Sequence, residues 1–368
     1  MADDTLIGRD ADLATLTDHL TGDDPIVLLT GPAGVGKSAV AEVVAEHWSA
    51  GPVYICELDE AEDDEHTVRA VAEGLGCDQT DDGIRAALEA STGTLIVLDG
   101  SDAALEVLAK RLAVWRADDP SSRVLITARR RIPIPGAAHL ELAALSESEA
   151  VALFESRARK ARPGFQVAGG KTPVIKDVVG RLDRMPEAIG LAADRMQVLS
   201  LDALDRRLAE PRIAIGAGSD PRGPMRKAFD TTWKNLDAPA RLTLQRCAVF
   251  AGPFDAAAAE AIVLLPPDGP SVPTALATLK DHSLVSTEAT DGALRFWMLD
   301  AIRQFAWDTL EASGERADVQ ARFVTWYAAL AGRLGRSGSD EEGLTELNRS
   351  WDNLIAAATW SMDQRPGE

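Results

Sequence analysis

A glycine-rich segment near the start of the chain carries the most specific chemical pattern. Residues 31–38 read Gly-Pro-Ala-Gly-Val-Gly-Lys-Ser and match G-x-x-x-x-G-K-[ST], between an apolar run and a helical pattern. In such a loop, backbone N–H groups converge on the β-phosphate of a nucleotide, and the positive end of the following helix faces the same anion. Lys37 would reach the β and γ oxygens, and Ser38 would ligate Mg²⁺. The alternative is a strand-to-helix turn without a ligand.

The loop predicts that the chain binds ATP or ADP with Mg²⁺. The predicted nucleotide contacts in it are consecutive: Gly31, Pro32, Ala33, Gly34, Val35, Gly36, Lys37, Ser38 and Ala39. A second metal ligand is expected from residues 94–99, because this apolar run ends in Asp99, the form in which an acid is presented to hydrated Mg²⁺. Asp99 is therefore predicted to hold the metal together with Ser38. The alternative is that Asp99 caps a helix.

The residues after Asp99 bear on hydrolysis. Gly100 occupies the position where fast ATPases commonly carry a second acid that orients water. Asp102 is the nearest substitute, either as a general base or as the cap of a helix that begins near residue 103. We therefore expect hydrolysis to be slow.

A basic group follows another apolar run. Residues 123–127 precede Ala-Arg-Arg-Arg, which places Arg129 at the sheet edge where ligands of α/β proteins bind. Its guanidinium could pair with the γ-phosphate through two hydrogen bonds. The alternative is a solvated basic turn, an interpretation that we apply to Arg130 and Arg131.

These groups need a scaffold, and residues 1–142 predict one. Short apolar runs alternate with helical patterns, which is typical of a parallel sheet covered by helices on both faces. The runs are 26–30, 53–58, 95–98, 124–127 and 139–142, and the helical patterns are 39–48, 67–75, 84–90 and 103–115. The predicted fold class is an α/β P-loop NTPase with a five-stranded parallel sheet.

The pattern becomes helical over residues 143–210. Ser146 and Glu149 have the spacing of a capping box, and helices are predicted at 150–158, 174–182, 187–198 and 201–208. This is a small helical domain. The proline- and glycine-rich residues 211–224 predict a linker.

A third domain is predicted over residues 225–312. Helices are expected at 225–236, 238–250, 255–263 and 273–281, followed by strands at 283–287 and 294–298 around an Asp291-Gly292 turn. Helices before a small hairpin suggest a winged-helix domain. Residues 313–368 predict two more helices, 319–334 and 344–360, as a short all-helical segment or the start of a helical repeat.

Composition narrows the class of partner. The formal net charge is -20, so the average surface potential repels phosphate backbones and nucleic acid is a disfavoured partner. No apolar run approaches the roughly 20 residues of a membrane span, and the N-terminus lacks the parts of a signal peptide, so we expect a cytoplasmic protein. Three widely spaced cysteines fit neither a disulfide framework nor a zinc site.

Together these motifs resemble the STAND class of signalling NTPases, and within it the NB-ARC-like ATPase module of bacterial multidomain regulators. Leu-Ile-Gly-Arg-Asp at 6–10 is similar to the V-G-R-E entry of that family, and residues 181–189 to its R-L-D-G-L-P-L-A-I segment. Residues 248–254 resemble S-V-F-A-G-G-F, and later landmarks match at 284–285, 301–306 and 352–354. The resemblance covers essentially the whole chain.

The resemblance implies roles for residues outside the loop. Ile7, Gly8 and Arg9 would border the adenine, Pro186 would pack against the base, and Arg129 would sense the γ-phosphate. As alternatives, Arg9 would be an exposed N-terminal charge and Pro186 a plain helix breaker.

Two departures from the family pattern concern the nucleotide. Met-Leu-Asp at 298–300 stands where relatives have Met-His-Asp, and Leu299 cannot donate the hydrogen bond of that histidine to the ADP phosphate. Asp300 is kept as a candidate nucleotide contact. Met185 and Glu187 flank Pro186 where the family usually has leucines, which would reshape the adenine pocket.

Three functions follow as hypotheses. The leading one is a switch in which ADP holds the domains closed and ATP favours opening and association with a protein partner or another copy. A second is a winged-helix DNA-binding regulator, although residues 273–281 contain only one basic residue, Lys280. A third is a continuously cycling ATPase of the AAA+ type, against which Gly100 argues.

Overall fold

The computed structural model divides into two compact units, Met1–Pro224 and Met225–Glu368, which are described separately. The described residues are 6–22, 24–59, 61, 63–90, 92–116, 121–166, 171–209, 229–230, 232–290, 293–337 and 341–363. The predicted linker 211–224 and the predicted Asp291-Gly292 turn lie outside these ranges, as does most of the predicted helix 225–236. The finer division into domains stays a prediction.

A five-stranded parallel sheet forms the centre of the first unit, as predicted. Its strand order is β2-β3-β4-β1-β5. The strands are β1 (Ile26–Thr30), β2 (Val53–Glu57), β3 (Leu95–Asp99), β4 (Arg123–Ala128) and β5 (Ala137–Glu141). Every residue of β1 is buried, which is typical of a strand covered on both faces. Because the strands are parallel, their carboxyl ends meet at one edge.

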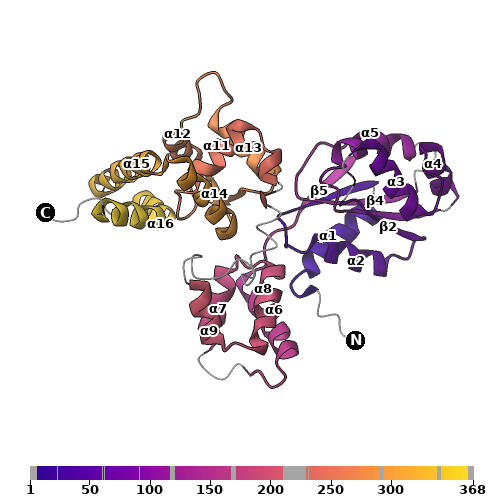
Figure 1. The fold of residues 1–368 in the computed structure, drawn as a ribbon, viewed down its shortest axis with the longest axis horizontal. Coiled ribbons are helices and arrows are strands. Elements are labelled where there is room, and N and C mark those ends of the chain that lie inside the picture. Colours follow the sequence, from indigo (N-terminus) through magenta and orange to yellow (C-terminus); the bar gives the residue numbers. More distant parts are fainter. Residues whose placement is uncertain are drawn as a thin grey trace. The chain divides into compact units, whose positions relative to one another are not determined.

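Helices cover both faces of this sheet (Figure 1). α1 (Asp10–Thr21) and α2 (Lys37–His47) lie on one face, and α3 (Asp64–Leu75), α4 (Asp81–Glu89) and α5 (Leu105–Trp115) on the other. We did not predict α1. It buries few residues, chiefly Leu16 and Leu20, and its N-cap, Arg9, makes no side-chain capping bond, so the usual start signal is missing.

The remainder of the first unit is helical. It contains α6 (Glu147–Ala161), α7 (Thr172–Arg181), α8 (Pro186–Asp194), a 3₁₀ turn η2 (Arg195–Gln197) and α9 (Leu201–Ala209). The capping box that we predicted at the start of α6 is present, with Ser146 and Glu149 each accepting a hydrogen bond from the backbone of the other. α6 and α8 pack against each other around buried residues such as Phe154 and Ile189.

The second unit consists of helices and one hairpin. Its elements are α11 (Ala238–Cys247), α12 (Ala256–Val263), α13 (Val272–Asp281), β6 (Ser286–Thr290), β7 (Ala293–Trp297), α14 (Asp300–Ser313), α15 (Arg316–Ser337) and α16 (Glu341–Asp363). β6 begins three residues later than predicted, because the N–H groups of Ser283 and Leu284 still bond to the last turn of α13. We did not predict α14, whose N-cap, Leu299, makes no side-chain capping bond.

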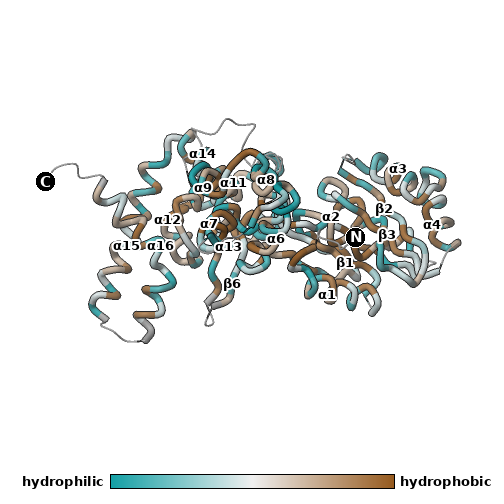
Figure 2. The backbone as a smooth tube through the Cα atoms, turned by 90° about the horizontal axis from the view of Figure 1, so that it is seen from below, coloured by the Kyte–Doolittle hydropathy of each residue, from teal (hydrophilic) through white to brown (hydrophobic). Residues whose placement is uncertain are grey.

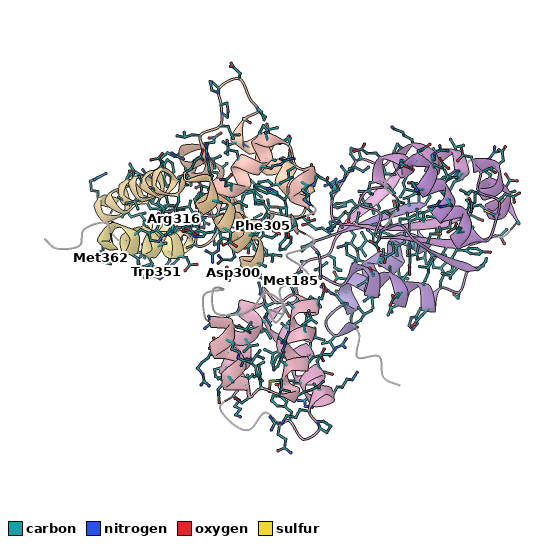
Figure 3. The ribbon with its side chains drawn as sticks, in the orientation of Figure 1. Met185, Asp300, Phe305, Arg316, Trp351 and Met362 are labelled. Carbon is teal, nitrogen blue, oxygen red and sulfur yellow. The ribbon has the colours of Figure 1, made fainter. Side chains whose placement is uncertain are left out.

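The long helices α15 and α16 are amphipathic, with hydrophilic and hydrophobic stretches alternating along each tube (Figure 2). α15 buries Phe323 and Tyr327 beside the stacked pair Phe250 and Phe254, whose ring centroids lie 4.0 Å apart. α16 leaves apolar side chains exposed, among them Trp351 (Figure 3). Within the described ranges, none of the helices combines the length and apolarity that a membrane crossing requires.

One buried amide ties α16 to the loop after α11. The Oδ1 atom of Asn353, a residue only 1 % exposed, accepts hydrogen bonds from the N–H groups of Ala251 (2.8 Å) and Gly252 (3.1 Å). Its Nδ2 donates to the carbonyl of Pro253 at 2.9 Å. A single side chain thus satisfies three backbone groups of this loop.

We predict that Asn353→Ala destabilises the second unit by about 2–3 kcal/mol, because buried backbone donors and an acceptor lose their partner. Chemical denaturation followed by tryptophan fluorescence measures the change. Asn348→Ala, an exposed position on the same helix, serves as the control and should change stability by less than about 0.5 kcal/mol. Equal stability of the two variants would contradict the role given to Asn353.

Candidate functional site

A cavity of about 360 Å³ opens beside the glycine-rich loop of the first unit. Residues from the N-terminal segment, the loop, α2, α6 and α8 line it: Leu6, Ile7, Arg9, Gly34, Val35, Gly36, Lys37, Ser38, Ala39, Leu153, Arg157, Pro186 and Glu187. Ile7, Arg9 and Pro186, which we assigned to the base, therefore share one cavity with the residues assigned to the phosphates. Of the loop residues that we predicted, Gly31, Pro32 and Ala33 are not part of this lining.

The loop has the backbone shape that close approach to an anion requires. It joins Thr30, the end of β1, to Lys37, the first residue of α2. At Gly31 the φ angle is +151°, and an added Cβ would lie 2.6 Å from the carbonyl oxygen of Leu142, so a side chain does not fit. Gly36 precedes α2 without a side-chain capping bond. The first N–H groups of this helix consequently have no side-chain acceptor at the cap, and a phosphate oxygen fits them.

Lys37 is held by backbone carbonyls. Its Nζ donates to Gly31 (2.9 Å) and Pro32 (3.1 Å). Burial lowers its pKa from 10.5 to about 8, and the charge of Arg129 acts in the same direction, against the opposing carboxylates of Asp102, Asp99 and Glu187. A bound polyphosphate would stabilise the protonated form of Lys37 and so raise its pKa.

Ser38 and Asp99 meet at the carboxyl edge of the sheet. The Ser38 hydroxyl donates to Oδ1 of Asp99 at 3.0 Å, and the Thr127 hydroxyl donates to the same oxygen. Asp99 is not a helix cap, since α5 begins at Leu105 after the N-cap Ala104. A hydroxyl and a carboxylate in contact beside the loop fit a Mg²⁺ ion that also binds phosphate oxygens.

Asp102 and Arg129 form an ion pair at the same edge. One carboxylate oxygen of Asp102 accepts the backbone N–H of Arg129, and the other accepts its Nε, both at 2.6 Å. Asp102 therefore does not cap α5, whose N-cap, Ala104, makes no side-chain capping bond. Among the neighbouring arginines, Arg130 reaches Glu106 at 3.2 Å and Arg131 is exposed.

Arg9 supports the loop from within. It is 4 % exposed, donates to the carbonyl of Val35 at 2.8 Å and pairs with Asp12 at 3.0 Å, so it is not an exposed N-terminal charge. Gly8 does not line the cavity and lies against the side chain of Glu149 instead. On the far side of the cavity Pro186 begins α8, and the N–H of Glu187 donates to the carbonyl of Gly34 at 3.2 Å.

Sequence reasoning missed three lining side chains, those of Leu6, Leu153 and Arg157, whereas Glu187 was expected only to reshape the adenine pocket beside Pro186. Leu153 and Arg157 are four residues apart on α6 and share a face of that helix. The Nε atom of Arg157 is buried without a hydrogen-bond partner among the described residues, which leaves a donor for a ligand. The sequence pattern located α6 but did not indicate which of its faces meets the cavity.

Two carboxylates in or near the site have raised pKa values. Burial raises the pKa of Glu187, and Lys37 opposes that shift. Burial also raises the pKa of Asp59, helped by the charges of Asp99 and Asp102. The sequence assigned no role to Asp59, and it assigned Glu187 only an effect on the shape of the adenine pocket.

Asp300 belongs to the second unit. It is the first residue of α14 (Figure 3) and pairs with Arg303 at 2.8 Å. The preceding Leu299 is buried in that unit. A contact between Asp300 and nucleotide stays a prediction.

Comparison with known proteins places this site in context. Residues 5–164 match the family model described as "AAA ATPase domain". "Uncharacterized protein Rv0894" of Mycobacterium tuberculosis is 30% identical over 339 residues, covering 87% of this chain and 84% of the relative. "Putative HTH-type transcriptional regulator Rv0890c" of the same organism is 29% identical over 360 residues, covering 94% of this chain. The chain spans only 40% of the length of that regulator.

Solved structures support the fold. "The walker-type atpase paby2304 of pyrococcus abyssi" aligns with a TM-score of 0.53 at 13% identity, covering 82% of this chain and 95% of that structure. A STAND protein with a tetratricopeptide repeat sensor, PH0952 from Pyrococcus horikoshii, aligns over 97% of this chain and 48% of its own at 16% identity. Its TM-score of 0.38 is too low to support a shared overall arrangement. At these identities the first likeness concerns the fold alone.

The lowered pKa of Lys37 generates a prediction about proton linkage. At pH 8.5 a lysine with a pKa of about 8 is largely neutral, and phosphate oxygens would raise that pKa, so ADP binding in EDTA should be accompanied by proton uptake. Calorimetry in buffers of different ionisation enthalpy measures this uptake. Lys37→Arg keeps a permanent charge and should bind ADP without uptake; equal uptake in both proteins would contradict the assignment. In the free protein, the same pKa shift predicts that stability rises between pH 8 and 10.5.

Proposed function

The chain belongs to the family of the mycobacterial "Uncharacterized protein Rv0894" and carries a P-loop ATPase domain, and from this premise we propose that it is an adenine-nucleotide switch that hydrolyses ATP slowly. The observation that carries the proposal is the shared cavity. The phosphate loop, the N-terminal segment and the helices α6 and α8 contribute to one lining, so a bound nucleotide would contact all of them.

In this proposal the phosphates and the metal occupy the loop end of the cavity. Lys37 exchanges its two carbonyl partners for β- and γ-phosphate oxygens, and the N–H groups at the start of α2 bind the β-phosphate. Ser38 and Asp99 hold Mg²⁺, which when bound neutralises charge on the phosphates. Ile7, Pro186 and Leu153 supply the apolar walls for the base, and Arg157 supplies a donor near them.

The nucleotide would control α8 through the loop itself. The hydrogen bond from the Glu187 N–H to the Gly34 carbonyl joins α8 to the phosphate loop, so a change in the loop alters a contact of the helical domain. Arg129 is the proposed sensor, because a γ-phosphate could replace Asp102 as its partner while the shorter ADP leaves that pair in place. ATP and ADP then make different contacts, which any population shift requires.

The second unit would report the state of the first. We interpret α11, α12, α13 and the hairpin β6–β7 as a winged helix, followed by the helical segment α15–α16. Opening in the ATP state would expose surfaces of these helices to a protein partner or to another copy of the chain. The family resemblance supports this assignment, and Asp300 at the start of α14 is its candidate contact with bound ADP.

A second candidate function is DNA binding, favoured by the name of the related "Putative HTH-type transcriptional regulator Rv0890c". The chain covers 40% of that relative, so its named activity does not have to lie in the shared part. Against DNA binding, Lys280 is the one basic residue of α13, and its Nζ donates to the Thr287 hydroxyl at 2.7 Å. A gel shift with duplex DNA at low salt distinguishes the nucleotide switch from a DNA-binding regulator. Retarded DNA would favour the DNA-binding function.

We predict that Lys37→Ala weakens ADP and ATP binding about 100-fold, since charge-assisted hydrogen bonds to phosphate are lost. The fold should be kept, as judged by an unchanged far-ultraviolet circular dichroism spectrum. Calorimetry with each nucleotide and Mg²⁺ gives the affinities. Lys110→Ala, an exposed lysine on α5, is the control, and equal affinities in the two variants would mean that the loop does not seat the phosphates.

We predict that Arg129→Ala abolishes the difference between ATP and ADP while both still bind. Small-angle scattering of the protein with each nucleotide measures domain opening. The exposed neighbour Arg131 supplies the matched control, since Arg131→Ala should leave the two profiles distinct. Distinct profiles in Arg129→Ala would remove Arg129 from the switch.

A further inference from the structure

Asp59 lies at the same edge of the sheet as the metal-site candidates, in the turn that follows β2, a strand that the sequence motifs do not include. It lies two residues after the end of β2, which pairs with β3 so that Glu57 faces Asp99. The N–H of Leu58 donates to the carbonyl of Asp99 at 2.8 Å, and the N–H of Ala61 donates back to Leu58 at 3.0 Å. These bonds fix the turn that carries Asp59 beside the end of β3.

The carboxylate of Asp59 fills the space beside Gly100. Gly100 has a φ of +70°, and a Cβ built on it would lie 2.3 Å from Oδ1, 2.5 Å from Cγ and 2.9 Å from Oδ2 of Asp59. Any larger residue at position 100 would therefore displace Asp59. Position 100, where fast P-loop ATPases carry an acid after the metal-binding aspartate, is a glycine here, and a carboxylate from the turn after β2 fills the space beside it.

The other two acids at this edge already have partners. Asp99 accepts from the hydroxyls of Ser38 and Thr127, and Asp102 is bound through both oxygens to Arg129. Asp59 is exposed, and no described residue donates a hydrogen bond to its side chain. Of these three carboxylates, Asp59 is the one that receives no hydrogen bond from a described residue, so both of its oxygens are open to water.

We propose that Asp59 is a catalytic residue that accepts a hydrogen bond from the attacking water in ATP hydrolysis. This inference depends on the proposed function. In the step, the water oxygen bonds to the γ-phosphorus, and the bond between that phosphorus and the β,γ-bridging oxygen breaks. The electron pair stays on ADP, and the proton that leaves the water passes through the Asp59 carboxylate to solvent. Asp102 pairs with the Arg129 side chain while no γ-phosphate is bound, and it still accepts the backbone N–H of Arg129 once a γ-phosphate replaces that pair, so base and sensor are separate groups.

The test compares Asp59→Asn with Glu57→Gln, which removes a carboxylate from an exposed position two residues earlier. Single-turnover hydrolysis of ATP with Mg²⁺ should fall at least 30-fold in Asp59→Asn, in keeping with the roughly 100-fold or larger contribution of general bases. Glu57→Gln should stay within about twofold of the parent. Calorimetry should give the Asn variant an ATP affinity equal to or higher than that of the parent protein. After incubation, chromatography of the bound nucleotide should find ATP in the variant and ADP in the parent.

Each outcome separates this inference from the proposed function. If the parent protein binds no nucleotide, the proposed function fails and Asp59 fails with it. If the parent binds and hydrolyses ATP and Asp59→Asn does so equally well, only the role of Asp59 is overturned. A parent protein that binds ATP without ever hydrolysing it would also overturn this role. A loss of ATP affinity in Asp59→Asn, parallel to the loss of hydrolysis, would show that the carboxylate shapes the site without acting on water.

Discussion

Parallel strand pairing is the constraint on which the site depends. Because β1, β2, β3 and β4 run in the same direction, the loops that follow them open at one edge of the sheet. The phosphate loop follows β1, Asp59 follows β2, Asp99 ends β3 and Arg129 follows β4. The side chains of Lys37 and Arg129, which are 92 positions apart in the sequence (129 − 37), thus meet at one edge of the sheet. A single rigid scaffold positions all of them, and each loop contributes a different chemical group.

An acidic chain that binds a polyanion needs local compensation. The net charge of -20 opposes phosphate at long range, and Asp59, Asp99 and Asp102 add negative charge at the site itself. The backbone N–H groups of the loop and the positive end of α2 compensate part of this negative charge without further basic side chains. Arg129 is engaged by Asp102, and burial lowers the pKa of Lys37 to about 8. Binding of a triphosphate would therefore depend on Mg²⁺, which would neutralise charge on both the ligand and the surrounding carboxylates.

The sequence predicted the sheet and the phosphate loop because each has a local signature. The strand ending in Asp99 and the loop ending in Lys37 and Ser38 are defined by consecutive residues, and the structure places these strands within one or two residues of the prediction. Arg157 and Asp59 were not predicted as site residues, because no local sequence pattern marks them. Their positions follow from which face of α6 is turned inward and from the order of β2 beside β3, and both are tertiary facts. Likewise α1 and α14 begin without a capping side chain, so the local sequence signal that usually marks the start of a helix is missing.

The pairing of Arg129 with Asp102 has a consequence for selectivity. A guanidinium already neutralised by a carboxylate yields only to a ligand that offers more negative charge than the acid that it displaces, and each exchange must also leave the released carboxylate solvated. Whether a ligand displaces Asp102 from Arg129 therefore depends on the negative charge of that ligand. A singly charged anion such as chloride would not displace Asp102, whereas a multiply charged phosphate group could, so the pair favours ligands of high negative charge.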